Sequence, residues 1–216
     1  MNTITKHTQI ETILNELFKE ASHDHIKMIK GIAKSVFRPI QPSDFKDVYL
    51  SVSKKQGEEL RQIIIENNFK NIVEFGTSFG ISTLYLAQGA LETNGNIVTT
   101  ELIPSKAKRA MENFTKAGVS QLIDLRVGDA LDTLKGYKNP IDLLVLDGWK
   151  DLYLPLFNLL ESTFHNKTII YVDNADMNYT QAFLKAIAQT SNYSQVSYHN
   201  GKVVLLQKAK KYSTIN

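Results

Sequence analysis

The chain has 216 residues, of which 43% are hydrophobic and 22% are charged, and its formal net charge is +3. This composition favours one domain with a sizeable core, and so small a basic excess is no argument for a nucleic-acid or membrane partner. The lack of cysteine excludes disulfides, thiolate metal sites and cysteine nucleophiles. With neither a signal peptide nor an apolar run of membrane-spanning length, we expect a soluble, cytoplasmic protein.

The first part of the chain is predicted to be helical. Apolar residues recur at helical spacing from Ile10 to Phe18 and again from Ile26 to Ala33, which indicates two amphipathic helices. The prolines of FRPIQPSDF cannot continue a helix, so this stretch is interpreted as a linker. We expect residues 1–45 to form a helical segment that serves as a lid, as a contact in a homodimer, or as both.

A doubly wound α/β fold is predicted for residues 46–216. After a helix over KKQGEELRQIIIENN, short β-rich runs alternate with helical segments from residue 71 onward. Runs such as LLVL and IIYV are continuously apolar, as expected of parallel strands that helices cover on both faces. Asn200 and Gly201 lie between two further β-like runs, which is a strong hairpin signal. The sequence therefore predicts a mostly parallel seven-stranded sheet with a C-terminal antiparallel hairpin.

A glycine-containing turn follows the first of these strands, in VEFGTSFG at residues 73–80. Glycine at position 76 would let a ligand approach the backbone, and Gly80 would allow a sharp turn where the next helix starts. The spacing differs from the G-x-G-x-x-G of dinucleotide-binding proteins, so no pyrophosphate cradle is expected. An ordinary tight turn would give the same pattern.

Acidic residues end the next two predicted strands. Glu101 ends NIVTTEL, where its carboxylate could accept hydrogen bonds from both hydroxyls of a ribose. Asp129 follows LIDLRVG, where it could accept from an adenine amino group, or could instead cap the helix that starts near Ala130. Together with the glycine turn, Glu101 indicates a ligand that carries a nucleoside.

Two further aspartates are expected to meet at the carboxyl edge of the sheet. Asp147 and Asp173 each end a highly apolar strand, and Asn174 follows directly. Two carboxylates in one cleft repel each other unless a proton or a cation lies between them. With the amide oxygen, the set consists of hard oxygen ligands, which suit Mg²⁺, Mn²⁺ or Ca²⁺ better than zinc or copper. The sequence therefore predicts a divalent-cation site.

At these residues the chain resembles a known family. LDGWKDLYLP at residues 146–155, followed by VDN at 172–174, resembles the metal-dependent catechol and caffeoyl-CoA O-methyltransferases, class I enzymes with bacterial members. The likeness runs from about residue 49 to 209 and implies a Rossmann-like methyltransferase domain over residues 46–216. It also implies that S-adenosylmethionine lies over the glycine turn and that a divalent ion, Mg²⁺ before Mn²⁺ or Ca²⁺, holds two adjacent hydroxyls of a small phenolic substrate.

The same resemblance implies roles for individual residues. Asp147, Asp173 and Asn174 would be the metal ligands, and Lys150 would be the base that removes the hydroxyl proton. The residues implied for the cofactor site are Val52, Glu74, Gly76, Ser78, Ser82, Glu101, Asp129, Ala130, Asp147 and Trp149. For Lys150 an ordinary salt bridge to Asp147 or Asp151 is the alternative.

Two positions depart from the family pattern. Gly148 stands where the catechol enzyme has a histidine beside the cofactor, and His199 stands where that family presents a glutamate toward the substrate. These departures leave the identity and the regiochemistry of the methyl acceptor open. His199 is expected to be exposed rather than catalytic.

For three histidines and for Trp149, the simpler expectation is a surface or packing position, with substrate stacking as the alternative for Trp149. His7, His23 and His25 are interpreted as surface residues, because the last two point to different helix faces. Trp149 is expected mainly to pack at its turn.

Rival functions make distinct demands on the sequence. A nicotinamide-dependent dehydrogenase would need the glycine pattern that is absent. A metal-independent methyltransferase acting on small molecules or nucleic acid, and a module that binds the cofactor without turnover, remain alternatives.

Overall fold

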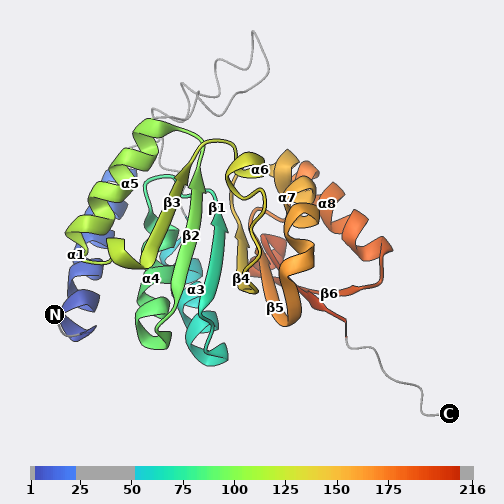
Figure 1. Cartoon of the computed structure of the whole chain (residues 1–216), viewed down its shortest axis with the longest axis horizontal. Helices are drawn as coiled ribbons and strands as arrows, with labels where there is room; N and C mark the ends of the chain where they lie inside the picture. Colours follow the sequence, from blue (N-terminus) through green and yellow to red (C-terminus); the bar gives the residue numbers. More distant parts are fainter. Residues whose placement is uncertain (1–2, 23–51, 210–216) are drawn as a thin grey trace, which may run out of the picture.

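A seven-stranded sheet in the order β3-β2-β1-β4-β5-β7-β6 forms the centre of the structure, a computed structural model that describes residues 3–22 and 52–209 (Figure 1). The strands are β1 (Asn71–Phe75), β2 (Asn96–Glu101), β3 (Ile123–Val127), β4 (Ile141–Leu146), β5 (Phe164–Val172), β6 (Tyr193–Tyr198) and β7 (Val203–Lys208). Strands β1 to β5 are joined by parallel pairings, and β7 is antiparallel to both β5 and β6. The predicted mostly parallel sheet with a C-terminal antiparallel hairpin is confirmed.

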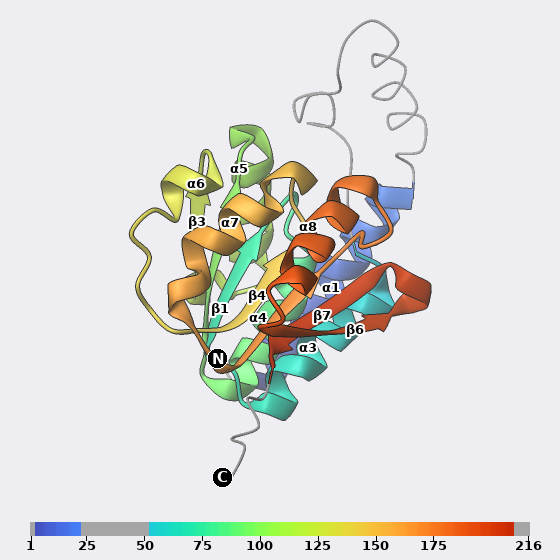
Figure 2. The ribbon, with the colours of Figure 1, turned by 90° about the vertical axis from the view of Figure 1, so that its right-hand side faces the viewer.

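Helices cover both faces of this sheet (Figure 2). Those of the first face are α1 (Thr3–Ser22), α3 (Lys54–Asn67), α4 (Ile81–Thr93) and α5 (Pro104–Lys116). Those of the second face are α6 (Ala130–Thr133), α7 (Tyr153–Leu160) and α8 (Asn178–Gln189). The short 3-10 helices are η3 (Ser120–Leu122), η4 (Lys150–Leu152), η5 (Glu161–Thr163) and η6 (His199–Gly201).

The strands alternate their side chains between two buried cores. On β4, Leu143 and Val145 join the core under the first helical layer, whereas Leu144 and Leu146 join the core under the second. All four are fully buried, because each face of a doubly covered parallel sheet is removed from water. This explains why the central strands read as continuous apolar runs.

The first N-terminal helix belongs to the same core as the sheet. Ile10, Ile13, Leu14 and Leu17 of α1 are buried in the cluster that also contains residues of α3 and α4. The first predicted amphipathic helix is therefore confirmed. The second one and the linker fall outside the described residues, as do His23 and His25. Within the described part, no helix is both long and apolar enough to cross a membrane.

The hairpin between β6 and β7 turns at the predicted place. Asn200 and Gly201 have φ values of 54° and 87°, so both adopt the left-handed conformation that Asn and Gly tolerate best. Strand β7, the last one among the described residues, does not lie at the edge of the sheet. It lies between β5 and β6, so β6 is the edge strand on that side.

Candidate cofactor and metal site

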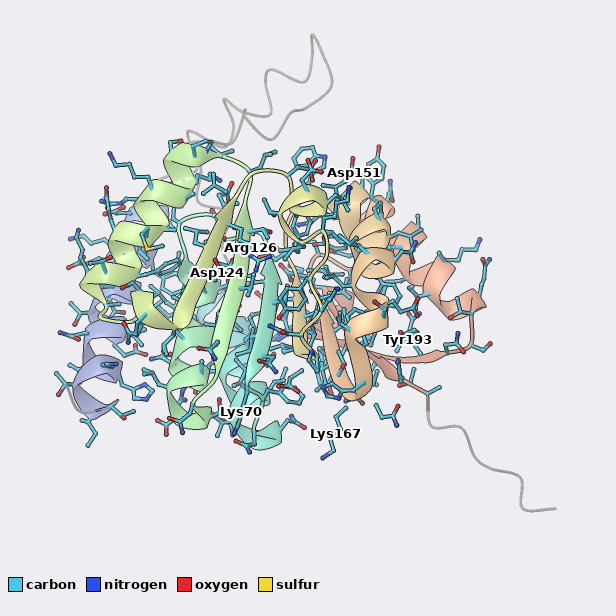
Figure 3. The ribbon with its side chains drawn as sticks, viewed as in Figure 1. Lys70, Asp124, Arg126, Asp151, Lys167 and Tyr193 are labelled. Atoms are coloured by element: carbon cyan, nitrogen blue, oxygen red, sulfur yellow. The ribbon has the colours of Figure 1, made fainter. Side chains whose placement is uncertain are left out.

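The carboxyl ends of the parallel strands bring the predicted site residues to one edge of the sheet. In Figure 3, Asp151, which follows β4, lies at the upper edge, whereas Lys70 before β1 and Lys167 near the start of β5 lie at the opposite edge. The backbone N–H of Asp147 donates to the Phe75 carbonyl at 3.0 Å. Such hydrogen bonds continue the sheet past its strand ends and fix the direction in which the following loops leave.

Asp147 and Asp173 are brought together as the sequence predicts. The Asp173 N–H donates to the carbonyl of Leu146 at 3.0 Å, so the two aspartates leave the ends of neighbouring paired strands. Asp173 is 5% exposed, and the side chain of Asp147 is 14% exposed. Burial, and next the charge of Asp173, raise the pKa of Asp147 well above its ordinary value of 3.8. The raised pKa favours the protonated form of the Asp147 carboxyl.

The third predicted metal ligand follows at once in the chain. Asn174 has a φ of 51°, and its carbonyl accepts from the Met177 N–H at 3.0 Å, so the chain turns sharply just after Asp173. Within the described residues no three His, Cys, Asp or Glu side chains gather in a group that could hold a metal. The candidate set is therefore two carboxylates and one amide, a composition that suits a hard cation.

Lys150 lies beside the carboxylate pair at the start of η4. Its ammonium group is 3.6 Å from Asp147 Oδ1 and donates to the Gly148 carbonyl at 2.8 Å. It also stands 5.6 Å from the centre of the Tyr153 ring, and its side chain is 18% exposed. The salt bridge to Asp147 that the sequence left open as an alternative for Lys150 is thus present.

The glycine turn after β1 packs against the end of β4. Gly76 has a φ of 107°, and a Cβ built on it would lie 2.7 Å from the carbonyl oxygen of Asp147. The backbone just after β4 therefore requires a glycine at position 76 by itself. Whether the glycine also lets a ligand approach stays a prediction. Gly80 precedes α4 with a φ of 91°, and its predicted role in the sharp turn is confirmed.

Glu101 connects the end of β2 to this turn. Its Oε2 accepts from the Ser78 N–H at 2.8 Å and its Oε1 accepts from the Ile103 N–H at 2.9 Å. Burial raises the pKa of Glu101, and both the hydrogen bond from Ile103 and the nearby Lys106 counteract that rise. The carboxylate is thus fixed by backbone donors, and each of its oxygens retains a further lone pair for a ligand.

Glu74 is fully buried among hydroxyl groups. Ser82 donates to its Oε1 at 2.6 Å, while Thr83 and Thr99 donate to its Oε2 at 2.6 Å each. Burial raises the pKa of Glu74, and the three hydroxyls oppose this rise. Glu74 therefore connects β1, β2 and α4. Thr83 and Thr99 were not predicted for this site. The only signal for them in the sequence is their position, Thr83 just after the glycine turn and Thr99 on the next strand.

The chain is similar to known O-methyltransferases over most of its length. The family model described as O-methyltransferase matches residues 10–209. The chain belongs to the O-methyltransferase family. It is 33% identical over 129 residues to the catechol O-methyltransferase of Niastella koreensis, and 33% identical over 126 residues to that of Mycobacterium tuberculosis. These matches cover 58% of this chain in both cases, and 58% and 57% of the two relatives.

Solved structures of the family share the fold. Cofactor-bound Rv0187 from MTB is 25% identical with a TM-score of 0.67, over 83% of this chain and 95% of that one. An O-methyltransferase from Bacillus cereus in complex with SAH is 24% identical with a TM-score of 0.66, over 85% of this chain and 97% of that one. The Rossmann-like methyltransferase fold implied by the sequence is confirmed.

The remaining residues predicted for the cofactor site of this O-methyltransferase family member have structural contacts of their own. Asp129 Oδ1 accepts from the Leu131 N–H at 2.8 Å, so the helix-capping alternative is realised at α6. Ala130 and Val52 are buried, at 3% and 2% exposure. Trp149 is partly buried against the core of the second face, which confirms its packing role.

The histidines that the structure describes have acidic partners. His7 pairs with Glu92 at 2.7 Å on the face of α1 and α4. His199 pairs with Glu59 of α3, and its side chain is only 16% exposed. The expectation that His199 is exposed is therefore wrong, because α3 covers the hairpin turn on that side.

Two exposed apolar residues near Glu101 were not predicted for the site. Leu102 directly follows β2 and is 51% exposed, and Val127 ends β3 beside it and is 49% exposed. A large apolar side chain left in water next to a buried carboxylate is a feature that only the folded chain reveals.

Proposed function

We propose that this chain transfers a methyl group from S-adenosylmethionine to a hydroxyl of a catechol-like or other vicinal-diol small molecule, in a reaction that depends on a divalent metal. The observation that carries the proposal is the pair Asp147 and Asp173 at the ends of the neighbouring strands β4 and β5, both largely buried, with the Lys150 ammonium group 3.6 Å from Asp147. The catechol O-methyltransferases among the relatives support the reaction class.

The metal would be held by Asp147, Asp173 and Asn174. The raised pKa of Asp147 supports this assignment, since a cation between the carboxylates would offset both the burial and the repulsion from Asp173 that disfavour its charged form. An all-oxygen set favours Mg²⁺, with Mn²⁺ or Ca²⁺ as substitutes. When bound, such an ion lowers the pKa of an attached hydroxyl and so favours the nucleophilic anion.

Lys150 would receive the proton of the substrate hydroxyl in its neutral form. The hydrogen bond to Gly148 and the 3.6 Å approach to Asp147 hold its amine group at the carboxylate pair. The residue thus combines the position and the chemistry of a general base.

The cofactor would lie along the carboxyl ends of β1 to β4. Glu101 would accept from the two ribose hydroxyls, and Asp129 would accept from the adenine amino group through the oxygen that does not cap α6. Leu102 and Val127 offer an apolar surface for the flat face of adenine. The other residues proposed to line this site are Val52, Glu74, Gly76, Ser78, Ser82, Ala130, Asp147 and Trp149.

The acceptor would meet an apolar rim beside the metal ligands. Met177 and Tyr179, just after Asn174, are 52% and 70% exposed. Apolar and aromatic side chains at the mouth of a polar site favour a planar aromatic molecule over a sugar. A phenolic diol fits both this rim and the proposed cation, and no membrane or nucleic acid is part of this proposal.

A direct assay tests the proposal. The purified chain is incubated with S-adenosylmethionine and Mg²⁺ against caffeoyl esters, catechols and flavonoids, and mass spectrometry detects the addition of a methyl group. We expect turnover of vicinal diols, little turnover of the matched monohydroxyl compounds, and loss of activity with excess chelator. Undiminished turnover in chelator would rule out the metal, and a panel without any product would favour a binding module.

A further inference from the structure

The start of helix α3 contacts one of the proposed metal ligands. Gln56, in the first turn of the helix, donates a hydrogen bond from Nε2 to Asp173 Oδ1 at 2.9 Å, although the two residues are far apart in the chain. Gln56 is half-buried and Asp173 is buried. A hydrogen bond from an amide to a buried carboxylate is charge-assisted whenever that carboxylate is ionised.

The same side chain closes the N-terminal cap of α3. Gln56 Oε1 accepts from the Ser53 N–H at 3.0 Å and from the Ser53 hydroxyl at 2.8 Å, and Ser53 Oγ in turn accepts from the Gln56 N–H at 3.3 Å. This reciprocal arrangement is a capping box. It fixes which way round the amide lies, because a flipped amide would point its oxygen at the carboxylate and its hydrogens at the Ser53 donors.

A buried tyrosine of β5 limits the alternatives for Asp173. Tyr171 lies two residues before it on the same face of the strand and is 1% exposed, and its hydroxyl has no partner of good geometry among the described residues. The Gln56 amide is therefore the group that orients the Asp173 carboxylate from the side of α3.

We propose that Gln56 is a positioning residue for the metal site: it anchors Asp173 Oδ1 so that the other carboxylate oxygen faces Asp147 and a shared cation. The inference rests on the proposed function, since it takes Asp147 and Asp173 to be metal ligands. Its physical basis is that a carboxylate already held in one orientation loses less rotational freedom when it binds an ion. The capping box in turn holds the amide, so α3 supplies a rigid support for the ligand.

Direct metal binding tests this role without any turnover. Free Mn²⁺ is counted by electron paramagnetic resonance as it is titrated into the wild-type chain and into Gln56→Met, Ser53→Ala and Asp173→Ala. Gln56→Met loses both the cap and the donor to Asp173, whereas Ser53→Ala weakens the cap and leaves that donor in place. Both variants should lose a similar part of the thermal stability.

The two variants should differ in metal affinity. We expect Gln56→Met to bind Mn²⁺ at least ~10-fold more weakly, the usual effect of removing a group that orients a ligand. Ser53→Ala should stay within about 2-fold of wild type, because the backbone N–H of residue 53 still donates to Gln56 Oε1 and keeps the amide turned toward Asp173. Gln56→Asn, which keeps an amide but is too short to reach Asp173, should behave like Gln56→Met and guards against a purely packing effect.

The outcomes separate the inference from the function on which it rests. If Asp173→Ala abolishes Mn²⁺ binding but Gln56→Met and Gln56→Asn bind as wild type does, Gln56 has no positioning role and the metal site stands. Equal losses in Ser53→Ala and Gln56→Met would likewise overturn the inference, because the cap alone would explain them. If Asp173→Ala binds Mn²⁺ like wild type, the proposed metal site itself fails, and the role of Gln56 fails with it.

Discussion

The ring of Phe75 occupies the space that a side chain at Gly148 would need. A Cβ built on Gly148 would lie 2.5 Å from two carbons of the ring. Phe75 is 8% exposed and packs edge-on against Tyr153 with the ring centroids 6.2 Å apart, so the ring has little room to retreat. Position 148, where the resembling family has a histidine, is thus a glycine here for a reason of packing.

Substitutions at Gly148 and Phe75 should show whether the Phe75 ring excludes a side chain at position 148. Gly148→Ala should lower the free energy of unfolding by about 1 to 3 kcal/mol, the usual cost of overpacking a core. In the background of Phe75→Leu, which removes the ring, the same change should cost much less. Urea denaturation of the wild type, both single variants and the double variant measures this coupling, and additive effects would show that the ring does not restrict position 148.

Gly76 should be far less replaceable than another glycine of positive φ. Gly136 has a φ of 76° but open space around its Cβ position, whereas a Cβ on Gly76 would strike the backbone of Asp147. Gly136→Ala should therefore cost only the backbone strain, about 1 to 2 kcal/mol. Gly76→Ala should cost more and should also weaken Mg²⁺ binding by displacing Asp147. Equal losses of stability in denaturant titrations would contradict the close approach.

The stability of the metal-free protein should fall as the pH rises. The pKa of Asp147 is raised in the folded state, so its contribution is fully present below its ordinary value of 3.8 and is lost as the pH passes through the raised value. Because a cation needs the ionised pair, the increase in melting temperature caused by Mg²⁺ should grow over the same range. The pKa of Glu74 and that of Glu101 are also raised, so Asp147→Asn is the variant that isolates this carboxyl. If the melting temperatures of wild type and Asp147→Asn depend on pH in the same way, the Asp147 carboxyl is not the source of the pH dependence.

Replacement of Lys150 should remove turnover while leaving binding intact. Lys150→Met keeps the length of the side chain but cannot take up a proton, so kcat should fall about 10² to 10⁴-fold. Calorimetry should find S-adenosylmethionine affinity unchanged. The matched control is Lys167→Met, an exposed lysine at the opposite edge of the sheet (Figure 3), which should be as active as wild type. A normal kcat in Lys150→Met would leave the salt bridge as the only role of this lysine.

Glu101 should matter for the cofactor and not for the metal. Glu101→Gln replaces one acceptor oxygen by a donor, so the affinity for S-adenosylmethionine should fall by about 10-fold to 100-fold, the value of one charge-assisted hydrogen bond. Mn²⁺ affinity should change little. Glu112→Gln alters an exposed glutamate on α5 and serves as the control. Parallel losses of cofactor and metal affinity in Glu101→Gln would mark the residue as structural.

The sheet and the acidic edge were predictable because both follow from local patterns. A doubly covered strand such as β4 must be apolar along its whole length, and a residue that follows such a strand must lie at the carboxyl edge. Asp147 and Asp173 could therefore be placed together from sequence alone. The hairpin at Asn200 and Gly201 was predictable for a similar reason, since few residues accept a left-handed backbone.

The long-range contacts were not predictable in this way. The capping motif of Ser53 and Gln56 is visible in the sequence, but nothing local reveals that the same amide reaches Asp173. The sequence predicts that Gly76 lets a ligand approach, but it does not reveal that the backbone of Asp147, after β4, also leaves no room for a side chain there. His199 has a polar, turn-like context that predicts exposure, yet Glu59 of α3 lies against it. Each of these depends on which elements pack side by side.

The insertion of β7 between β5 and β6 has a consequence for biosynthesis. Strand β5, which leads into Asp173, is paired with β4 on one side and with β7 on the other, and the ribosome makes β7 after both of them. A nascent chain halted before Val203 would already contain every proposed ligand and the proposed base, yet its fifth strand would expose an unpaired edge. During co-translational folding, the pair Asp147 and Asp173 should therefore become stably positioned only after the β6–β7 hairpin has emerged from the ribosome. The hairpin would then be needed for the site to form, although it supplies none of the proposed ligands.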